Sequence, residues 1–165
     1  MTVYHLVPTE GVRDQVLVSL SILKSVAPKL WEEAIKKYEG RYEILDQRVL
    51  PLDCLHSEVI NLSLVHPALI RDAYEKCTGY SLNWYRCFEI PLTALDHDRA
   101  VIWMPDNNEY WPLKEHRLPG MEKVPAATIA YYQQAASAGE RPYIQQHVPH
   151  VLYRGVIHVG GLRIV

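Results

Sequence analysis

Apolar residues recur at helical spacing in two early segments of the chain. In the first, from Thr9 to about Ser25, they stand roughly three or four positions apart, at Val12, Val16, Leu20 and Leu23. Thr9 is a residue type that caps helix N-termini. A second segment begins at Pro28, which suits a first helical turn, and ends at Gly40. The pattern predicts helices over 9–25 and 28–40.

Strands are indicated where apolar and polar residues alternate or where short apolar runs occur. In Val59–Val65, residues Ile60, Leu62 and Leu64 would share one face of a strand. Shorter strand-like segments are 3–7, 84–90, 100–104, 143–144 and 151–159. The stretch 105–119 is rich in loop-forming residues.

Two further helices are expected in the middle and later parts of the chain. One opens at Pro67 and stops near Gly79, and the other covers 125–138. Helices therefore gather mainly in the first half, while strands predominate from Val59 onward. This order predicts an α+β fold in which helices pack on a mixed, mostly antiparallel sheet, rather than a doubly wound parallel sheet. A length of 165 residues, without a repeat or linker, predicts one domain over 1–165.

The composition excludes several classes of protein. The net charge is −2, so there is no global basic field, and a nucleic-acid partner would need a local basic patch or a nucleotide pocket. Three widely spaced cysteines form neither a disulfide framework nor a zinc pattern, which favours a reducing compartment. Without a signal-like opening or an apolar run of about 18 residues, we expect a cytoplasmic protein that does not enter a membrane.

Sequence motifs of common enzyme classes are absent as well. The chain contains no GxGxxG, GxxxxGK[ST], HExxH or GxSxG. This argues against a dinucleotide-binding Rossmann dehydrogenase, a P-loop NTPase, a zinc protease of the HExxH type and an α/β-hydrolase.

His5 lies within the opening apolar segment and has two interpretations. A histidine on a first strand can contact a cofactor, or it can be an ordinary half-buried side chain. Aromatic usage leaves a similar choice. Eleven tyrosines and four tryptophans accompany one phenylalanine, which suits a pocket or an interface, and equally a core built with tyrosine.

Other residues with reactive or charged side chains could likewise have a functional role or an ordinary structural one. Arg41 and Arg48 flank an extended segment and could grip a pyrophosphate, or be solvated loop residues. Cys87 could be a nucleophile if a histidine lay beside it, although a strand cysteine is usually a small apolar residue. Glu140, just after a predicted helix, could stabilise a cationic sugar, or be a solvated carboxylate.

The C-terminal histidines invite a metal site. His147 and His150 have a short, ligand-like spacing, and His158 follows. No cysteine or acidic residue accompanies them at a known spacing, and Pro149 disfavours a helical pair. We therefore expect loop and strand histidines and no metal. The run Asp106-Asn107-Asn108 is a turn signal.

Together these segments resemble the ADP-ribosyltransferase fold, and most of all the DNA-modifying toxins of the DarT type. Tyr4-His5-Leu6-Val7 followed by a helix resembles the opening strand of that family. The segment from Pro51-Leu52-Asp53 through Asn61 to Pro67 resembles its second conserved strand and the short helix that follows. Trp84 to Leu95 resembles the next strand, with the turn at 106–108 near an asparagine-containing loop. Arg141-Pro142-Tyr143-Ile144 to Pro149 resembles the last conserved strand and its Val-Pro turn.

The resemblance implies a split sheet and NAD as substrate. It implies that His5 holds a ribose hydroxyl, that Tyr74 or a nearby aromatic residue stacks on nicotinamide, and that Arg41 or Arg48 grips the pyrophosphate. The glutamate of the family begins the last strand, where this sequence has Arg141 or Pro142; Glu140, one position away, would take that role.

Three functions follow as alternatives. The first is an NAD-dependent ADP-ribosyltransferase that acts on a nucleic-acid or protein acceptor. The second is a non-catalytic binding module on the same fold, of an immunity or adaptor type, which would have a partner protein. The third is another enzyme on this fold, such as an RNA phosphotransferase with NAD-like chemistry.

Overall fold

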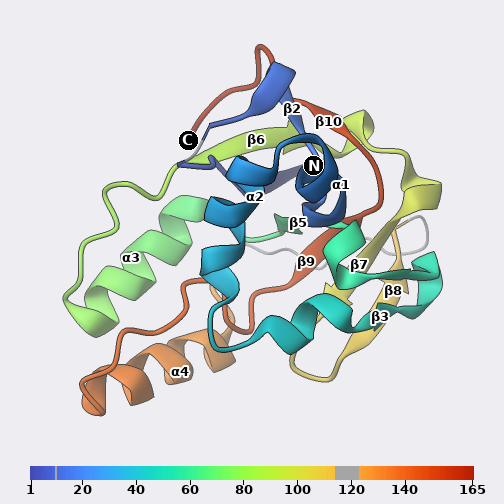
Figure 1. Ribbon diagram of the computed structural model, residues 1–165. Coiled ribbons are helices and arrows are strands. Elements are labelled where there is room, and N and C mark those ends of the chain that lie inside the picture. The colour runs from blue at the N-terminus through green and yellow to red at the C-terminus, as the bar shows by residue number, and fades with distance from the viewer. Residues whose placement is uncertain (10, 114–122) are drawn as a thin grey trace.

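A six-stranded sheet forms the centre of the molecule (Figure 1). The computed structural model describes residues 1–9, 11–113 and 123–165. All five pairings within this sheet are antiparallel, which confirms the α+β class and the mostly antiparallel sheet. In spatial order the strands are β6 (Cys87–Pro91), β1 (Thr2–Leu6), β5 (Ile60–Ser63), β9 (His150–Tyr153), β7 (Ala100–Met104) and β8 (Glu109–Pro112).

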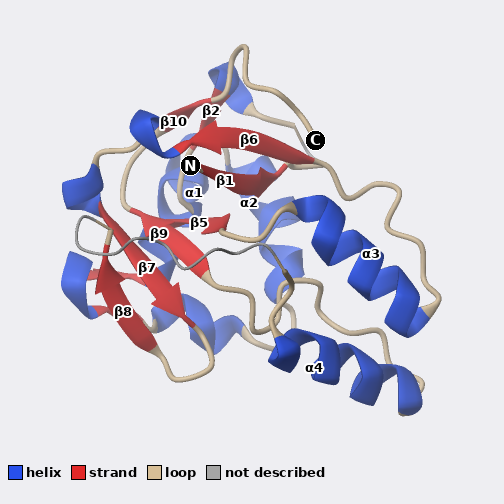
Figure 2. Ribbon diagram, turned by 180° about the vertical axis from the view of Figure 1, so that it is seen from behind, coloured by secondary structure: helices blue, strands red, loops and turns tan. Residues whose placement is uncertain are grey.

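The described residues contain four α-helices, which agree well with the sequence prediction where proline and glycine mark their ends. They are α1 (Leu20–Val26), α2 (Pro28–Ile35), α3 (Pro67–Thr78) and α4 (Ala126–Ser137). Pro28 and Pro67 each occupy a first helical turn, and Gly79 ends α3 at a φ of 74°. Figure 2 shows α3 and α4 side by side, away from β8. Within the described residues, no helix is long and apolar enough to cross a membrane.

The single helix expected over 9–25 is wrong. Gly11, Asp14 and Gln15 all have positive φ, a conformation that interrupts a helix. The segment instead forms a short 3-10 turn, Arg13–Gln15, and then strand β2 (Val16–Leu17), which pairs with β10 (Ile157–His158). Only the last third of the segment is helical, as α1. The apolar spacing of this segment is compatible with a helix, but residues 16–17 pair with β10 as a strand instead.

Two predictions in the C-terminal half also need correction, one of a loop and one of a strand. Part of the stretch expected to be a loop forms β8, which pairs with β7 around the predicted turn, where Asn108 has a φ of 53°. Its aromatic residues pack across from β7, while residues 114–119 of that stretch lie outside the described residues. Tyr143 and Ile144, expected as a strand, lie in a turn instead.

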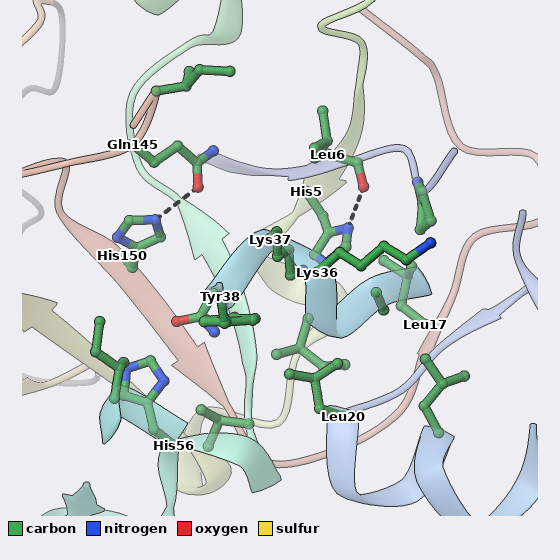
Figure 3. Close-up of a pocket in the computed structure, with 18 of the residues that line it drawn as sticks. His5, Leu6, Leu17, Leu20, Lys36, Lys37, Tyr38, His56, Gln145 and His150 are labelled. Atoms are coloured by element: carbon green, nitrogen blue, oxygen red, sulfur yellow. Dashed lines mark hydrogen bonds between the residues drawn. The ribbon is translucent and has the colours of Figure 1, made fainter. Parts of the chain in front are cut away.

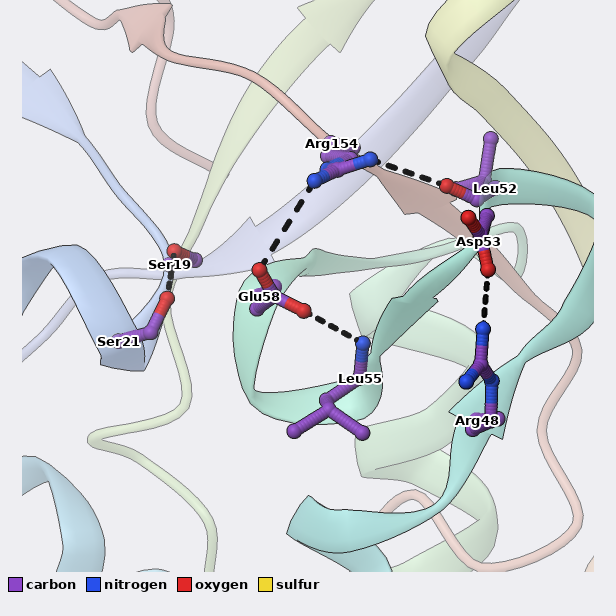
Figure 4. Close-up of polar contacts among 8 residues, drawn as sticks. All are labelled: Ser19, Ser21, Arg48, Leu52, Asp53, Leu55, Glu58 and Arg154. Carbon is purple, nitrogen blue, oxygen red and sulfur yellow. Dashed lines mark hydrogen bonds and ion pairs between the residues drawn. The ribbon is translucent and has the colours of Figure 1, made fainter.

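Residues 48–58 form a small polar frame beside the sheet (Figure 4). Strand β3 (Arg48–Val49) pairs with β4 (Cys54–Leu55), and Arg48 forms an ion pair with Asp53. Glu58 accepts a hydrogen bond from the backbone N–H of Leu55 at 2.7 Å. Arg154, which follows β9, donates to the carbonyl of Leu52 at 3.1 Å. These contacts fix the turn that carries His56.

Neighbouring cross-strand rows of the sheet differ sharply in character. Directly opposed residues share one face, so the pairings define a row that crosses all six strands. This polar row contains Glu89, Tyr4, Ser63, His150, Trp103 and Tyr110. The adjacent row, with Leu62, Val151 and Ile102 fully buried, points to the opposite face and into the largest apolar cluster.

Candidate functional site

A cleft of about 1750 Å³ opens where β1 and β5 separate. These two strands share a single register pair, Tyr4 with Ser63. Beyond it, His5 and Leu6 of β1 and Ile60 and Asn61 of β5 line the cleft. Figure 3 shows its interior, with side chains from β1, β9 and the segment after α2 converging on one space. The short contact between β1 and β5 therefore leaves room for the cleft at this point.

His5 lies in this cleft as a neutral imidazole. Its Nδ1–H donates to the carbonyl of Leu6 at 2.7 Å, so Nε2 carries the lone pair. Burial, with a further contribution from the nearby Lys37 ammonium, lowers the pKa of His5 to about 3. A neutral imidazole with a lone pair on Nε2 can accept a hydrogen bond from a hydroxyl.

Arg41 lies in the cleft, and no ion pair joins it to a carboxylate in the part of the chain that the structure describes. Its guanidinium is 4.1 Å from the ring centroid of Tyr143 and 5.5 Å from that of Tyr38. One N–H donates to the carbonyl of Lys37 at 3.1 Å, whereas the buried Nε has no hydrogen-bond partner among the described residues. No described carboxylate pairs with it. A cation held by aromatic faces, with an unsatisfied donor, is suited to bind an anion.

The cleft as a whole is basic in a chain whose net charge is negative. Its lining includes Arg13, Lys36, Lys37, Arg41, Arg48 and Arg141, against three acidic residues. Two of those, Asp14 and Glu33, are already paired with Arg13 and Lys36. This provides the local basic patch that the overall composition lacks, and it favours an anionic ligand.

The other residues expected to bind NAD have different surroundings. Arg48 lines the cleft, but its side chain is exposed and paired with Asp53. Tyr74 is only 1% exposed; its hydroxyl donates to the carbonyl of Pro142 at 3.3 Å and its ring packs edge-on against Tyr132. The ring of Tyr74 therefore belongs to a core cluster and presents no open face on which a ligand can stack.

Glu140 is not brought into the cleft. It lies exposed just after α4, where its backbone N–H donates to the carbonyl of Ala135. The structure thus gathers His5, Arg41, Arg48 and Tyr74 around one cavity and leaves Glu140 outside it. The acidic residues that do line the cavity are Asp14, Glu33 and Glu39.

His150, at the start of β9, is held by a hydrogen-bonded chain. Gln145 donates from its amide nitrogen to the hydroxyl oxygen of Tyr85 at 2.7 Å. Its carbonyl oxygen is then the acceptor for His150 Nε2 at 3.1 Å, which leaves the proton on Nε2 and the lone pair on Nδ1. His150 is 6% exposed, and burial lowers its pKa to about 4. Its Nδ1 has no hydrogen-bond partner among the described residues.

His56 lies on the same side of the pocket as His150 (Figure 3). It is 4% exposed, and neither ring nitrogen has a hydrogen-bond partner in the described part of the chain. Burial lowers its pKa to about 4. The ring of Trp103 contacts both histidines, with centroid distances of 5.1 Å to His56 and 6.0 Å to His150.

The histidines considered for a metal site do not form one. His147 pairs with Asp106 at 2.5 Å, and His158 is exposed on β10 outside the cleft. Across the described ranges, no group of three or more histidine, cysteine or acidic residues has the arrangement of a metal site. Cys87 is buried, and burial raises the pKa of its thiol to about 12, which disfavours the nucleophilic thiolate.

Several cleft residues escaped sequence reasoning. His56, Gln145 and the Tyr38–Tyr143 pair around Arg41 come from irregular segments without periodicity. The excess of tyrosine indicated a pocket or an interface, but composition does not show which tyrosines line it. The run Asp106-Asn107-Asn108 indicated a turn but no role in the cleft. In the structure Asn108 lines the cleft and accepts a hydrogen bond from Trp103 Nε1 at 3.0 Å.

Comparisons with known proteins assign no family. No protein-family model matches the chain, and the searches of curated proteins and of solved structures give no match either.

Proposed function

We propose that the basic cleft binds NAD and that the protein acts as an NAD-dependent ADP-ribosyltransferase on a nucleic-acid or protein acceptor. The observation that carries this proposal is Arg41: no described carboxylate pairs with it, two tyrosine rings flank it, and its buried Nε has no hydrogen-bond partner within the described ranges. A planar guanidinium matches the geometry of phosphate oxygens. A pyrophosphate would supply both the missing charge and the missing hydrogen bond.

His5 supports a nucleotide that carries ribose. Because Leu6 holds the proton on Nδ1, Nε2 is available to accept a hydrogen bond from a ribose hydroxyl. The neutral state matters, since an imidazolium has no acceptor. Lys37 lies near His5 (Figure 3), so a phosphate bound near its ammonium would leave the sugar within reach of the imidazole.

The transfer step requires departure of nicotinamide from a sugar that becomes cationic. A carboxylate near the anomeric carbon would lower that barrier. Glu39 is the cleft carboxylate for which no ion pair is recorded within the described ranges, whereas Asp14 and Glu33 are paired. Glu140 would need to move to reach the cleft.

The position of Glu140 favours a second candidate function. A non-catalytic NAD-binding or nucleotide-binding module needs the basic cleft and His5 but no catalytic carboxylate. This alternative differs from the first in one observable, because a binder is stabilised by NAD without releasing nicotinamide.

The experiment follows thermal unfolding and nicotinamide release in the presence of millimolar NAD. A ligand that binds only the folded state raises the melting temperature. We expect NAD to raise it for the wild type, and the shift to disappear in Arg41→Gln. The matched control is Arg163→Gln, an exposed arginine outside the cleft, which should keep the full shift. Nicotinamide release selects the enzyme and a shift without release selects the binder; no shift in the wild type rules out both.

A further inference from the structure

One wall of the cleft carries two buried histidines that have hydrogen-bonding capacity to spare. His56 leaves both ring nitrogens unpartnered, and His150 leaves Nδ1 unpartnered, among the described residues. Both line the cleft, at 4% and 6% exposure. Buried polar groups without partners are rare in folded proteins because their desolvation is uncompensated. Their presence therefore points to a bound group that completes them.

The chemistry of these nitrogens narrows the class of that group. Burial keeps both imidazoles uncharged near neutral pH, so they do not form an anion site. A neutral imidazole offers one donor and one acceptor. On His150 the Nε2–H donates to the amide oxygen of Gln145, so the nitrogen still available to a ligand is Nδ1, an acceptor. The wall as a whole thus offers adjoining donors and acceptors without charge.

The surroundings of the two rings favour a planar ligand. Trp103 lies against both histidines, and Tyr110, opposite Trp103 in the sheet, also lines the cleft. Heterocyclic bases have flat faces that stack on aromatic side chains and edges that present donors next to acceptors. The cationic residues of the cleft would hold the phosphates of the same molecule or of a neighbouring one.

We propose that His56, His150 and Trp103 form a subsite for a heterocyclic base, separate from the phosphate-binding Arg41. The proposal rests on the proposed function for the identity of the phosphate ligand, but not for the base. The base has two sources: NAD itself, through nicotinamide or adenine, or a nucleobase of the acceptor. The same edge chemistry recognises each of them.

The test measures dissociation constants by calorimetry for probes that separate these sources. The probes are inorganic pyrophosphate, nicotinamide mononucleotide, adenosine monophosphate, and the uncharged nucleosides guanosine, cytidine and thymidine. His56→Phe keeps an aromatic ring against Trp103 and removes both nitrogens. His158→Phe, at an exposed histidine outside the cleft, is the matched control.

We expect His56→Phe to weaken at least one base-carrying probe tenfold or more and to leave pyrophosphate unchanged. His56→Gln, which keeps a donor and an acceptor, should recover part of that affinity. His158→Phe should bind every probe like the wild type. Loss for nicotinamide mononucleotide or adenosine monophosphate identifies NAD as the source, and loss for a nucleoside alone identifies the acceptor.

The proposal is overturned if no base-carrying probe binds the wild type, or if His56→Phe weakens none of them. A uniform loss that includes pyrophosphate, without recovery in His56→Gln, also overturns it, because that result reflects a damaged fold. A nucleoside that depends on His56 in a protein that fails to bind NAD would keep the base subsite and refute the proposed function.

Discussion

Two adjacent rows of one sheet show how this molecule divides stability from binding. The apolar row through Leu62, Val151 and Ile102 is fully buried in the largest core cluster. The polar row is displaced from the apolar row by one residue along each strand. It includes His150, Trp103 and Tyr110, and these three line the cleft. A shift of one residue reverses the face of a strand. The same strands thus provide a dry core on one side and a polar, aromatic wall on the other.

The difference teaches where hydrogen bonds are left incomplete. The apolar row needs none. On the polar row Ser63 is satisfied locally, by its own bonds to the backbone of Val65. His150 and its neighbour His56 keep nitrogens without a hydrogen-bond partner among the residues that the structure describes. Among the described residues, the unpartnered nitrogens of Arg41, His56 and His150 lie in the cleft, where a ligand could complete them, whereas the unpartnered hydroxyl of Thr128 on α4 lies outside it.

The largest expected effect is on the apolar row. Ile102→Ala removes a fully buried side chain and leaves a cavity, so we expect the free energy of unfolding to fall by about 3 kcal/mol. Urea denaturation measures it. Ile22→Ala, at an isoleucine that is 39% exposed, should lower it by no more than about 1 kcal/mol. Equal losses in the two variants would contradict the division between the rows.

Acid should weaken the polar side of the sheet. The pKa of His56 is lowered from 6.5 to about 4, and burial disfavours its charged form. The unfolded chain therefore binds the proton first as pH falls, so the free energy of unfolding begins to decrease near pH 6.5, and this loss is complete near pH 4.

Between pH 7 and pH 5 this loss amounts to about 2 kcal/mol for His56. His56→Phe should lack that part of the decrease, while His158→Phe should retain it. Urea denaturation of the three proteins at both pH values gives the comparison. The same decrease in His56→Phe as in the wild type would show that His56 is not the buried neutral group described.

Gln145 should matter more than its partial exposure suggests. Gln145→Leu leaves the hydroxyl of Tyr85 and Nε2 of His150 without their partner, so we expect a loss of about 1.5 kcal/mol in the free energy of unfolding. Gln133→Leu, at an exposed glutamine on α4, serves as the control. A loss no larger than in that control would break the proposed link from Tyr85 to His150.

The smallest effect has the opposite sign. At pH 7 and without ligand, His56→Phe replaces two unsatisfied nitrogens by carbon in a buried site, and we expect the free energy of unfolding to rise by about 1 kcal/mol. Such a gain is typical where a residue is kept for binding rather than for stability. A clear loss would indicate that His56 serves packing and would weaken the base subsite.

The sequence predicted the regular part of this fold and only part of the cleft. Helices α2, α3 and α4 and strands β5 and β7 have clear periodicity or proline and glycine boundaries. The segment before α1 was misjudged because its apolar spacing suits a helix, whereas positive φ at Asp14 and Gln15 and pairing with β10 decide its structure.

The site followed the same division. His5 and Arg41 were identified because a strand histidine and a loop arginine are recognisable residue types. His56 and Gln145 were not, because their positions depend on long-range contacts of irregular segments. Glu140 was chosen for its neighbourhood in the sequence, and that neighbourhood lies outside the cleft.

The central claim is that Arg41 holds a diphosphate in the cleft formed where β1 and β5 separate. A crystal structure with bound ADP-ribose tests it most directly. The account predicts the diphosphate on the guanidinium of Arg41, between Tyr38 and Tyr143, with a ribose hydroxyl donating to Nε2 of His5. A diphosphate bound elsewhere, with Arg41 unchanged and His5 without a ligand contact, would contradict it.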